Sequence, residues 1–194
     1  MAKKSVDLRS KTDPQWVNVI LDNFDEFLRD HANCERKASA LAMSLVVKYP
    51  DRDRIIPDLI TLAQEELEHF AQVYELMQKR GLTLAKDIQD PYVNLLLGEM
   101  RSGREERFLD RLLISSVIEC RGAERFRIIS EALTDPDLKV FYRNLWAAEA
   151  KHGHQFVDFV LRYESAETVY ARLDELVQRE AEILENLSWR ASLH

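Results

Sequence analysis

The feature that most constrains the fold is a spacing of acidic and histidine residues that occurs twice. Glu66 and His69 stand three residues apart, and Glu35 lies 31 residues before Glu66. On an α-helix, residues three apart project from one face, about 60° apart around the axis. The second half of the chain repeats this arrangement with an offset of 30 residues, in Glu119, Glu149 and His152. Each half therefore predicts a helical hairpin with one Glu on its first helix and Glu-x-x-His on its second.

The composition supports helices throughout. The 194 residues are 46% hydrophobic, which is enough for a sizeable core, and only five Gly and five Pro interrupt them. We find no strand candidate and expect one domain spanning residues 1–194, with the polar residues 1–12 flexible.

Hydrophobic periodicity, together with Pro and Gly positions, predicts the helix boundaries. Asp13-Pro14 and Asp135-Pro136 are typical of an N-cap and a first-turn proline, and Gly81 is typical of a helix end. After the charged connection 51–57, a helix should run to Gly81. The other expected helices span about 16–21, 23–49, 105–133, 136–163 and 166–189, and a short helix ends near residue 100 within the link 82–104. Such a link suits a crossover along a bundle.

The chemistry of the repeat indicates a metal centre. Inward carboxylates in a helical core are costly unless they are paired or bound to metal. Four carboxylates and two imidazoles satisfy two divalent cations and leave positions open for dioxygen, and the absence of thiolates favours iron or manganese over structural zinc. This is the ligand pattern of ferritin-like carboxylate bundles. The sequence thus predicts an all-α, ferritin-like four-helix bundle with a long crossover and additional N- and C-terminal helices.

Several neighbours compete with these ligands. Glu65 lies four residues before His69 and could share its face, but the symmetry with the downstream pair favours Glu66. His154 points about 200° away from His152, so it is expected either at the surface or beside a ligand without binding the metal. Glu124 is expected to pair with Arg121 or Arg127.

Two further residues lie on ligand faces. His31 precedes Glu35 by one turn, so it is either a hydrogen-bond partner of a ligand carboxylate or a packed core histidine. Tyr142 lies two turns before Glu149, where it could act similarly or bond to backbone. Cys34 and Cys120 adjoin predicted ligands but point about 100° away, and we interpret them as small core residues.

Charge and cysteine content limit the possible binding partners and the cellular compartment. The net charge of −7 argues weakly against a general nucleic-acid binder, since phosphate contacts need a basic surface. A local basic patch remains open, although acidic residues interleave with its arginines, and a salt-bridged solvated face is the alternative. The patch residues are Arg101, Arg104, Arg107 and Arg111. Two cysteines and a longest uncharged run of ten residues, 38–47, predict a cytoplasmic protein without a membrane span.

With these residues placed, the sequence resembles the MiaE-type tRNA hydroxylases. The matching stretches, which span most of the chain, are residues 31–38 (HANCERKA), 65–70 (EELEHF), 109–113 (LDRLL), 118–126 (IECRGAERF), 141–142 (FY) and 149–152 (EAKH). There are two departures. Gly122-Ala123 stands where a Ser-Cys-like pair is expected, and Lys151-His152 is followed by Gly153 where Arg-His is more usually followed by an aromatic residue.

The resemblance implies a non-haem di-iron monooxygenase that hydroxylates the isopentenyl group of 2-methylthio-N6-isopentenyladenosine beside the anticodon of tRNA. It implies two iron ions per chain, dioxygen as co-substrate and an external electron donor such as a ferredoxin or reductase. The family's iron ligands fall on the six residues that the spacing indicated: Glu35, Glu66, His69, Glu119, Glu149 and His152. The basic patch then becomes the candidate tRNA contact.

Two other functions fit a ferritin-like fold. One is a protein that oxidises or stores iron, which would require a closed cage, whereas we expect a monomer or small homo-oligomer. The other is an oxygenase that acts on a small hydrocarbon or aldehyde. The family resemblance favours the tRNA hydroxylase.

Overall fold

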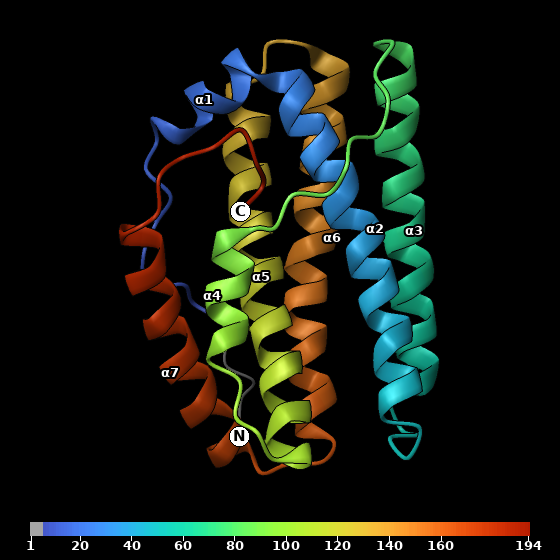
Figure 1. Ribbon diagram of the computed structural model, residues 1–194, viewed down its shortest axis with the longest axis vertical. Helices are drawn as coiled ribbons and strands as arrows, with labels where there is room; N and C mark the ends of the chain where they lie inside the picture. Colours follow the sequence, from blue (N-terminus) through green and yellow to red (C-terminus); the bar gives the residue numbers. More distant parts are fainter. Residues whose placement is uncertain (1–5) are drawn as a thin grey trace. The chain divides into compact units, whose positions relative to one another are not determined.

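The computed structural model describes residues 6–194, and within that range it contains α-helices and no strand. The helices are α1 (Trp16–Asp22), α2 (Phe24–Lys48), α3 (Ile56–Lys79), α4 (Pro91–Gly98), α5 (Arg104–Ala132), α6 (Pro136–Leu161) and α7 (Ala166–Glu185) (Figure 1). The all-α prediction is confirmed. No helix in this range combines the length and the hydropathy needed to cross a membrane.

The chain forms two compact units. One contains residues 18–88 and 190–193, and the other contains 6–17, 89–189 and 194. Each unit holds one of the two predicted helical hairpins, α2 with α3 and α5 with α6. The single domain expected from the sequence stays a prediction.

Helices α2 and α3 lie side by side as the first hairpin (Figure 1). Pro57 occupies the first turn of α3, where its missing N–H costs no helical hydrogen bond. Gly81 follows the end of α3 with a φ of 69°, a left-handed conformation that glycine adopts without a steric penalty. The predicted helix end at Gly81 is thus confirmed. Between the helices, the Ser39 hydroxyl donates to the Ala63 carbonyl at 2.7 Å.

Helices α5 and α6 form the second hairpin, and α7 packs against α4, α5 and α6 (Figure 1). Side-chain oxygens cap three helix starts by accepting backbone N–H groups: Asp90 at α4, Asp135 at α6 and Ser165 at α7. Each cap satisfies donors that the first helical turn leaves without partners.

Helix α7 ends at Glu185, so the prediction that it continues to about residue 189 was wrong. The Asn186 side chain donates to the Glu182 carbonyl at 2.7 Å and caps the last turn there. The apolar residue Trp189, which suggested a longer helix, is 46% exposed.

The segment before α1 makes defined contacts within its unit. Arg9 pairs with Asp174 of α7 at 2.5 Å, and the Thr12 hydroxyl donates to Glu124 of α5 at 2.7 Å. The expected flexibility of residues 1–12 falls partly on residues 1–5, which lie outside the described range.

Candidate metal centre

The first hairpin gathers three of the predicted ligands. Glu35 on α2 and Glu66 on α3 are 3% and 1% exposed. His69 Nδ1 lies 3.4 Å from Glu66 Oε2 and 3.7 Å from Glu35 Oε2. Each of the three side chains offers one ligand atom, and these atoms lie within 4.8 Å of one another.

The arrangement follows from the helix pattern. Ser39 joins α2 to α3 one turn after Glu35, at Ala63, one turn before Glu66. This bond fixes the register at which the two carboxylates face each other. Glu66 is buried and the competing Glu65 is half-buried, so burial agrees with the choice made from symmetry.

His31 lies directly behind Glu35. Its Nε2 is 2.6 Å from Glu35 Oε1, and its ring is fully buried and stacks on Phe27 with centroids 5.6 Å apart. A hydrogen bond of this kind fixes the orientation of a carboxylate that binds metal. Both alternatives for His31 apply at once, because it is a packed core residue that also bonds to a predicted ligand.

The second hairpin holds the other three predicted ligands. Glu149 and His152 on α6 are 3% and 0% exposed, and His152 Nδ1 lies 3.4 Å from Glu149 Oε2. Glu119 is half-buried on α5, and neither Glu119 nor His152 belongs to the close group of ligand atoms found among the described residues. The separation between Glu149 and His152 equals that between Glu66 and His69, as expected for two identical helical spacings.

Gly153, next to His152, lets α5 and α6 approach closely. A Cβ at this position would lie 2.5 Å from Cys120 Sγ and 3.3 Å from the Ser116 carbonyl oxygen. The Ser116 hydroxyl donates to the Gly153 carbonyl at 2.6 Å. An aromatic residue here would not fit this packing, which gives the departure noted in the sequence a physical reason.

The other residues considered in the sequence as neighbours of the predicted ligands have the following exposures and partners. His154 is exposed, which agrees with the first of its two predicted positions. Glu124 pairs with Arg121, which confirms one of its two predicted partners. The Tyr142 ring is fully buried and packs against Phe126 with centroids 5.6 Å apart. Burial raises the pKa of the half-buried Cys120 thiol to about 12, so this cysteine stays protonated at neutral pH.

The predicted basic patch is largely engaged within its own unit. Arg101 donates to the fully buried Asp110 at 2.8 Å, and Arg172 of α7 donates to the same carboxylate at 2.9 Å. Arg104 pairs with Glu105 at 3.1 Å. Arg107 is exposed and Arg111 is half-buried. The interleaved acids therefore neutralise at least two of the four arginines.

A buried ionic network behind α5 was not foreseen. Arg121 is fully buried, and its Nε and Nη2 donate to Glu180 of α7 at 2.7 and 3.0 Å. The Tyr92 hydroxyl donates to the same carboxylate at 3.0 Å. Arg125 lies 4.8 Å from the Trp16 ring, and burial lowers its pKa to about 10. One signal was present in the sequence, because Glu180 falls on the apolar stripe of α7 at helical spacing from Leu173, Leu176 and Val177.

The donor set fits a divalent transition metal. Carboxylate oxygens and imidazole nitrogens are ligands that iron and manganese accept. A structural zinc site would often use thiolates, which Glu35, Glu66 and His69 do not supply. The chemistry of the donor atoms in the first hairpin therefore favours iron or manganese over structural zinc.

This chain is similar in sequence to one family of known proteins, whose members share a named activity. A family model described as tRNA-(MS[2]IO[6]A)-hydroxylase (MiaE) matches residues 1–194. A relative from Pseudomonas putida is 33% identical over 184 residues, which cover 94% of this chain and 89% of the relative. A relative from Salmonella typhimurium is 27% identical, covering 91% and 83% of the two chains. Both are named tRNA 2-(methylsulfanyl)-N(6)-isopentenyladenosine(37) hydroxylase.

A solved structure shares the fold. It is described as protein 43 with aldehyde deformylating oxygenase activity, from Synechococcus, and it superposes with a TM-score of 0.91 at 33% identity. The match covers 96% of this chain and 94% of that one. The ferritin-like fold class expected from the sequence is thereby confirmed.

Proposed function

We propose, from the premise that this chain belongs to the MiaE family of tRNA hydroxylases, that it hydroxylates the isopentenyl group of 2-methylthio-N6-isopentenyladenosine next to the anticodon of tRNA. The observation that carries the proposal is the family match over residues 1–194. The same match favours this activity over iron storage and over oxygenation of a small hydrocarbon.

Two iron ions per chain are the proposed cofactor. They would be held by Glu35, Glu66 and His69 from the first hairpin and by Glu119, Glu149 and His152 from the second. When bound, such a pair of ions supplies the activation of dioxygen that hydroxylation of an allylic C–H bond requires.

The chain's own residues would orient the ligands and keep the site dry. Burial of Glu35, Glu66, Glu149 and His152 excludes bulk water from the ligand atoms, so polar interactions there are stronger than in solvent. His31 holds Glu35 from behind, and Ser39 and Ser116 fix the two helix registers. These groups restrict motion of the carboxylates, which is the protein's part in setting the geometry of a metal site.

The remaining parts of the proposal concern partners. Electrons would come from an external donor such as a ferredoxin or reductase. We also propose that the chain works as one domain, as a monomer or small homo-oligomer in the cytoplasm, and that Arg101, Arg104, Arg107 and Arg111 face the tRNA.

The proposal is tested by mass spectrometry of tRNA nucleosides from cells with and without the gene. The hydroxylated isopentenyl nucleoside should disappear in the deletion strain and its unhydroxylated precursor should accumulate. Complementation with wild-type protein should restore it, and a Glu66→Ala, His69→Ala variant should not. Persistence of the hydroxylated nucleoside in a strain without a second such gene would contradict the assignment.

A fatty-aldehyde assay of the same purified protein addresses the activity for which the Synechococcus protein is named. Under the proposal, tRNA from the deletion strain is hydroxylated and the aldehyde is left unchanged.

A further inference from the structure

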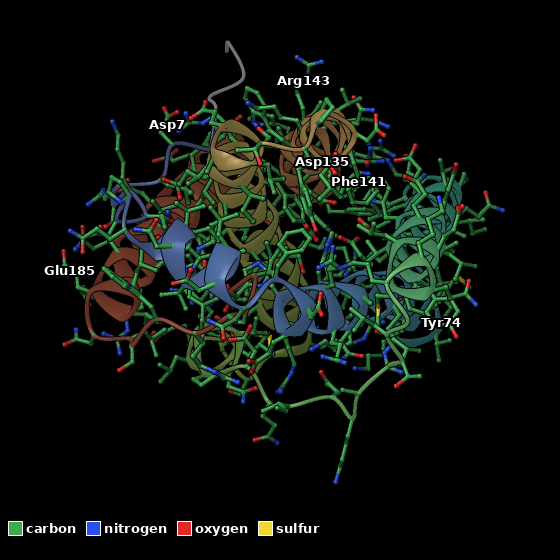
Figure 2. The ribbon with its side chains drawn as sticks, turned by 90° about the horizontal axis from the view of Figure 1, so that it is seen from above. Asp7, Tyr74, Asp135, Phe141, Arg143 and Glu185 are labelled. Carbon is green, nitrogen blue, oxygen red and sulfur yellow. The ribbon has the colours of Figure 1, made fainter. Side chains whose placement is uncertain are left out.

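A cavity lies at the corner where α5 ends and α6 begins. It has a volume of about 550 Å³, and its lining includes Ser130, Glu131, Lys139, Val140, Arg143 and Trp146. Figure 2 shows Arg143 extending outward from α6, beyond the turn that carries Asp135. The volume lies within the range of cavities that bind small organic groups such as a nucleoside.

The charge of this cavity is positive. Its one carboxylate, on Glu131, pairs with Arg127 at 3.1 Å. Lys139 and Arg143 form no ion pair with any residue in the described part of the chain. They differ in this respect from Arg101 and Arg104, whose charges are already matched by Asp110 and Glu105. A cation without an internal partner gains more from a phosphate, because no existing ion pair has to be broken.

The same cavity offers an apolar surface beside these cations. Trp146 contributes an indole ring, and Val140 is 47% exposed. Aromatic rings stack on unpaired nucleobases, and cations beside them meet the phosphates.

The cavity is also placed along the helix that carries predicted metal ligands. Trp146 lies one turn before Glu149, and Arg143 lies two turns before it, about 9 Å along the axis at 1.5 Å per residue. A nucleotide held here would therefore lie within about two helical turns of Glu149 along α6.

We propose that this corner cavity binds a nucleotide of the tRNA anticodon loop next to the modified adenosine. Lys139 and Arg143 contact its phosphates, and Trp146 stacks on its base. The inference rests on the proposed function and names a contact surface for that substrate that does not include Arg101, Arg104, Arg107 or Arg111.

An acidic electron-donor protein could also pair with the two cations. The cavity favours RNA, because a concave site with an indole beside two cations matches the alternation of base and phosphate. Two cations alone on a flat face would carry no such preference.

The test is binding of a fluorescently labelled anticodon stem-loop RNA, measured by anisotropy at several salt concentrations with the purified full chain. Lys139→Gln with Arg143→Gln should raise Kd about tenfold. It should also reduce the slope of log K against log salt by about 1.4, since each single-strand phosphate contact contributes about 0.7. The matched control, Lys48→Gln with Arg190→Gln, removes the same charge from exposed positions that do not line the cavity and should leave both quantities unchanged.

The stacking contact is tested at Trp146. Trp146→Ala should weaken binding about tenfold, whereas Trp146→Phe keeps an aromatic face and should bind within about threefold of wild type. The Phe variant separates loss of the aromatic ring from loss of folding. Circular dichroism of both variants would show whether either has lost helical structure.

Equal Kd and salt slope in the cavity variant and its control would overturn the inference. If the variant keeps its RNA affinity but loses turnover supported by the donor protein, the cavity serves the donor and the inference is wrong. If tRNA hydroxylation in cells depends on the gene while RNA binding ignores the cavity, the proposed function stands and the inference fails. RNA binding that depends on the cavity, found together with the hydroxylated nucleoside persisting in the deletion strain, would support the inference and contradict the proposed function.

Discussion

The two hairpins carry the same predicted ligands at the same spacing but support them differently. In the first, His31 lies one turn before Glu35, and its Nε2 is 2.6 Å from the carboxylate. The equivalent position before Glu119 is Ser115, whose hydroxyl donates to the Arg111 carbonyl of its own helix at 2.9 Å. The repeat therefore extends to the predicted ligands and not to the residues one turn before them.

The hydrogen bonds that join the two helices of each hairpin are also similar in kind but different in position. Ser39 lies four residues after Glu35 and reaches Ala63, whereas Ser116 lies three residues before Glu119 and reaches Gly153. Each hairpin thus has one hydroxyl-to-carbonyl bond near its ligands, donated from opposite sides of the first Glu. At Gly153 a Cβ would lie 2.5 Å from Cys120 Sγ of the facing helix, so the second hairpin tolerates little change at this contact.

The largest expected effect is loss of metal when either half loses its first carboxylate. Glu35→Ala and Glu119→Ala should each lower iron below two per chain and reduce hydroxylation at least about 100-fold, because a missing ligand leaves the cation under-coordinated. Metal analysis of the purified variants measures this. Glu68→Ala, on the exposed side of α3, is the matched control and should keep two iron ions. Unchanged stoichiometry in the first two variants would refute the ligand set.

The next effect contrasts an ion pair in each hairpin. Asp110 is fully buried between Arg101 and Arg172, whereas Asp25 of α2 meets Arg80 at 2.7 Å with both side chains partly exposed. Asp110→Asn should lower the free energy of unfolding by about 2–3 kcal/mol, and Asp25→Asn by less than about 1 kcal/mol. Urea denaturation measures both, and equal losses would show that burial does not distinguish the two pairs.

This contrast also has a pH dependence. Burial alone would raise the pKa of the Asp110 carboxyl, but hydrogen bonds from Arg101 and Arg172 outweigh it and hold the pKa below its ordinary value. A lowered pKa stabilises the fold above the unfolded value of about 4, and this stability is lost as pH falls through the folded pKa. The difference between wild type and Asp110→Asn should therefore be constant near neutral pH and shrink below about pH 4. If the stability difference between wild type and Asp110→Asn instead grew on acidification, the pKa of Asp110 would not be lowered in the folded state.

A smaller effect separates the residues behind the two first-helix carboxylates. His31→Ala should weaken iron binding about 10- to 100-fold, because Glu35 loses the group that orients it. Ser115→Ala should change affinity less than about twofold, because its hydroxyl bonds within its own helix. Competition with a chelator measures both affinities, and His31→Gln, which can still donate a hydrogen bond, should recover part of the loss. Equal effects at the two positions would make the hairpins equivalent.

The smallest effect concerns the close helix contact. Gly153→Ala should cost about 1–2 kcal/mol through overpacking against Cys120 and Ser116, which corresponds to a lower Tm by roughly 2–8 °C for a chain of this size. Adding Cys120→Ala should recover part of this loss, since it removes the nearer of the two atoms. Cys120→Ala alone is the control. A Gly153→Ala variant with the wild-type Tm would show that α5 and α6 separate without cost.

The elements themselves could be read from local pattern. Asp135-Pro136 and Gly81 mark a helix start and a helix end through the chemistry of single turns. The end of α7 could not be placed this way, because the apolar Trp189 continues the pattern while Asn186 caps the helix. The charge of the arginines around the start of α5 and the acids between them were also visible, but the complete burial of Asp110 beside Arg101 was not.

The sequence by itself determined the all-α class, the helix hairpins and the face that each predicted ligand occupies, because these depend on periodicity over a few residues. Only the tertiary structure decided which partners meet across the fold. Arg121 reaches Glu180, 59 residues later, and Gly153 meets Ser116, 37 residues earlier. Such contacts depend on how helices pack, and no local spacing encodes them. The repeated Glu-x-x-His spacing therefore indicates candidate metal ligands, while the side chains that contact those candidates could be identified only from the structure.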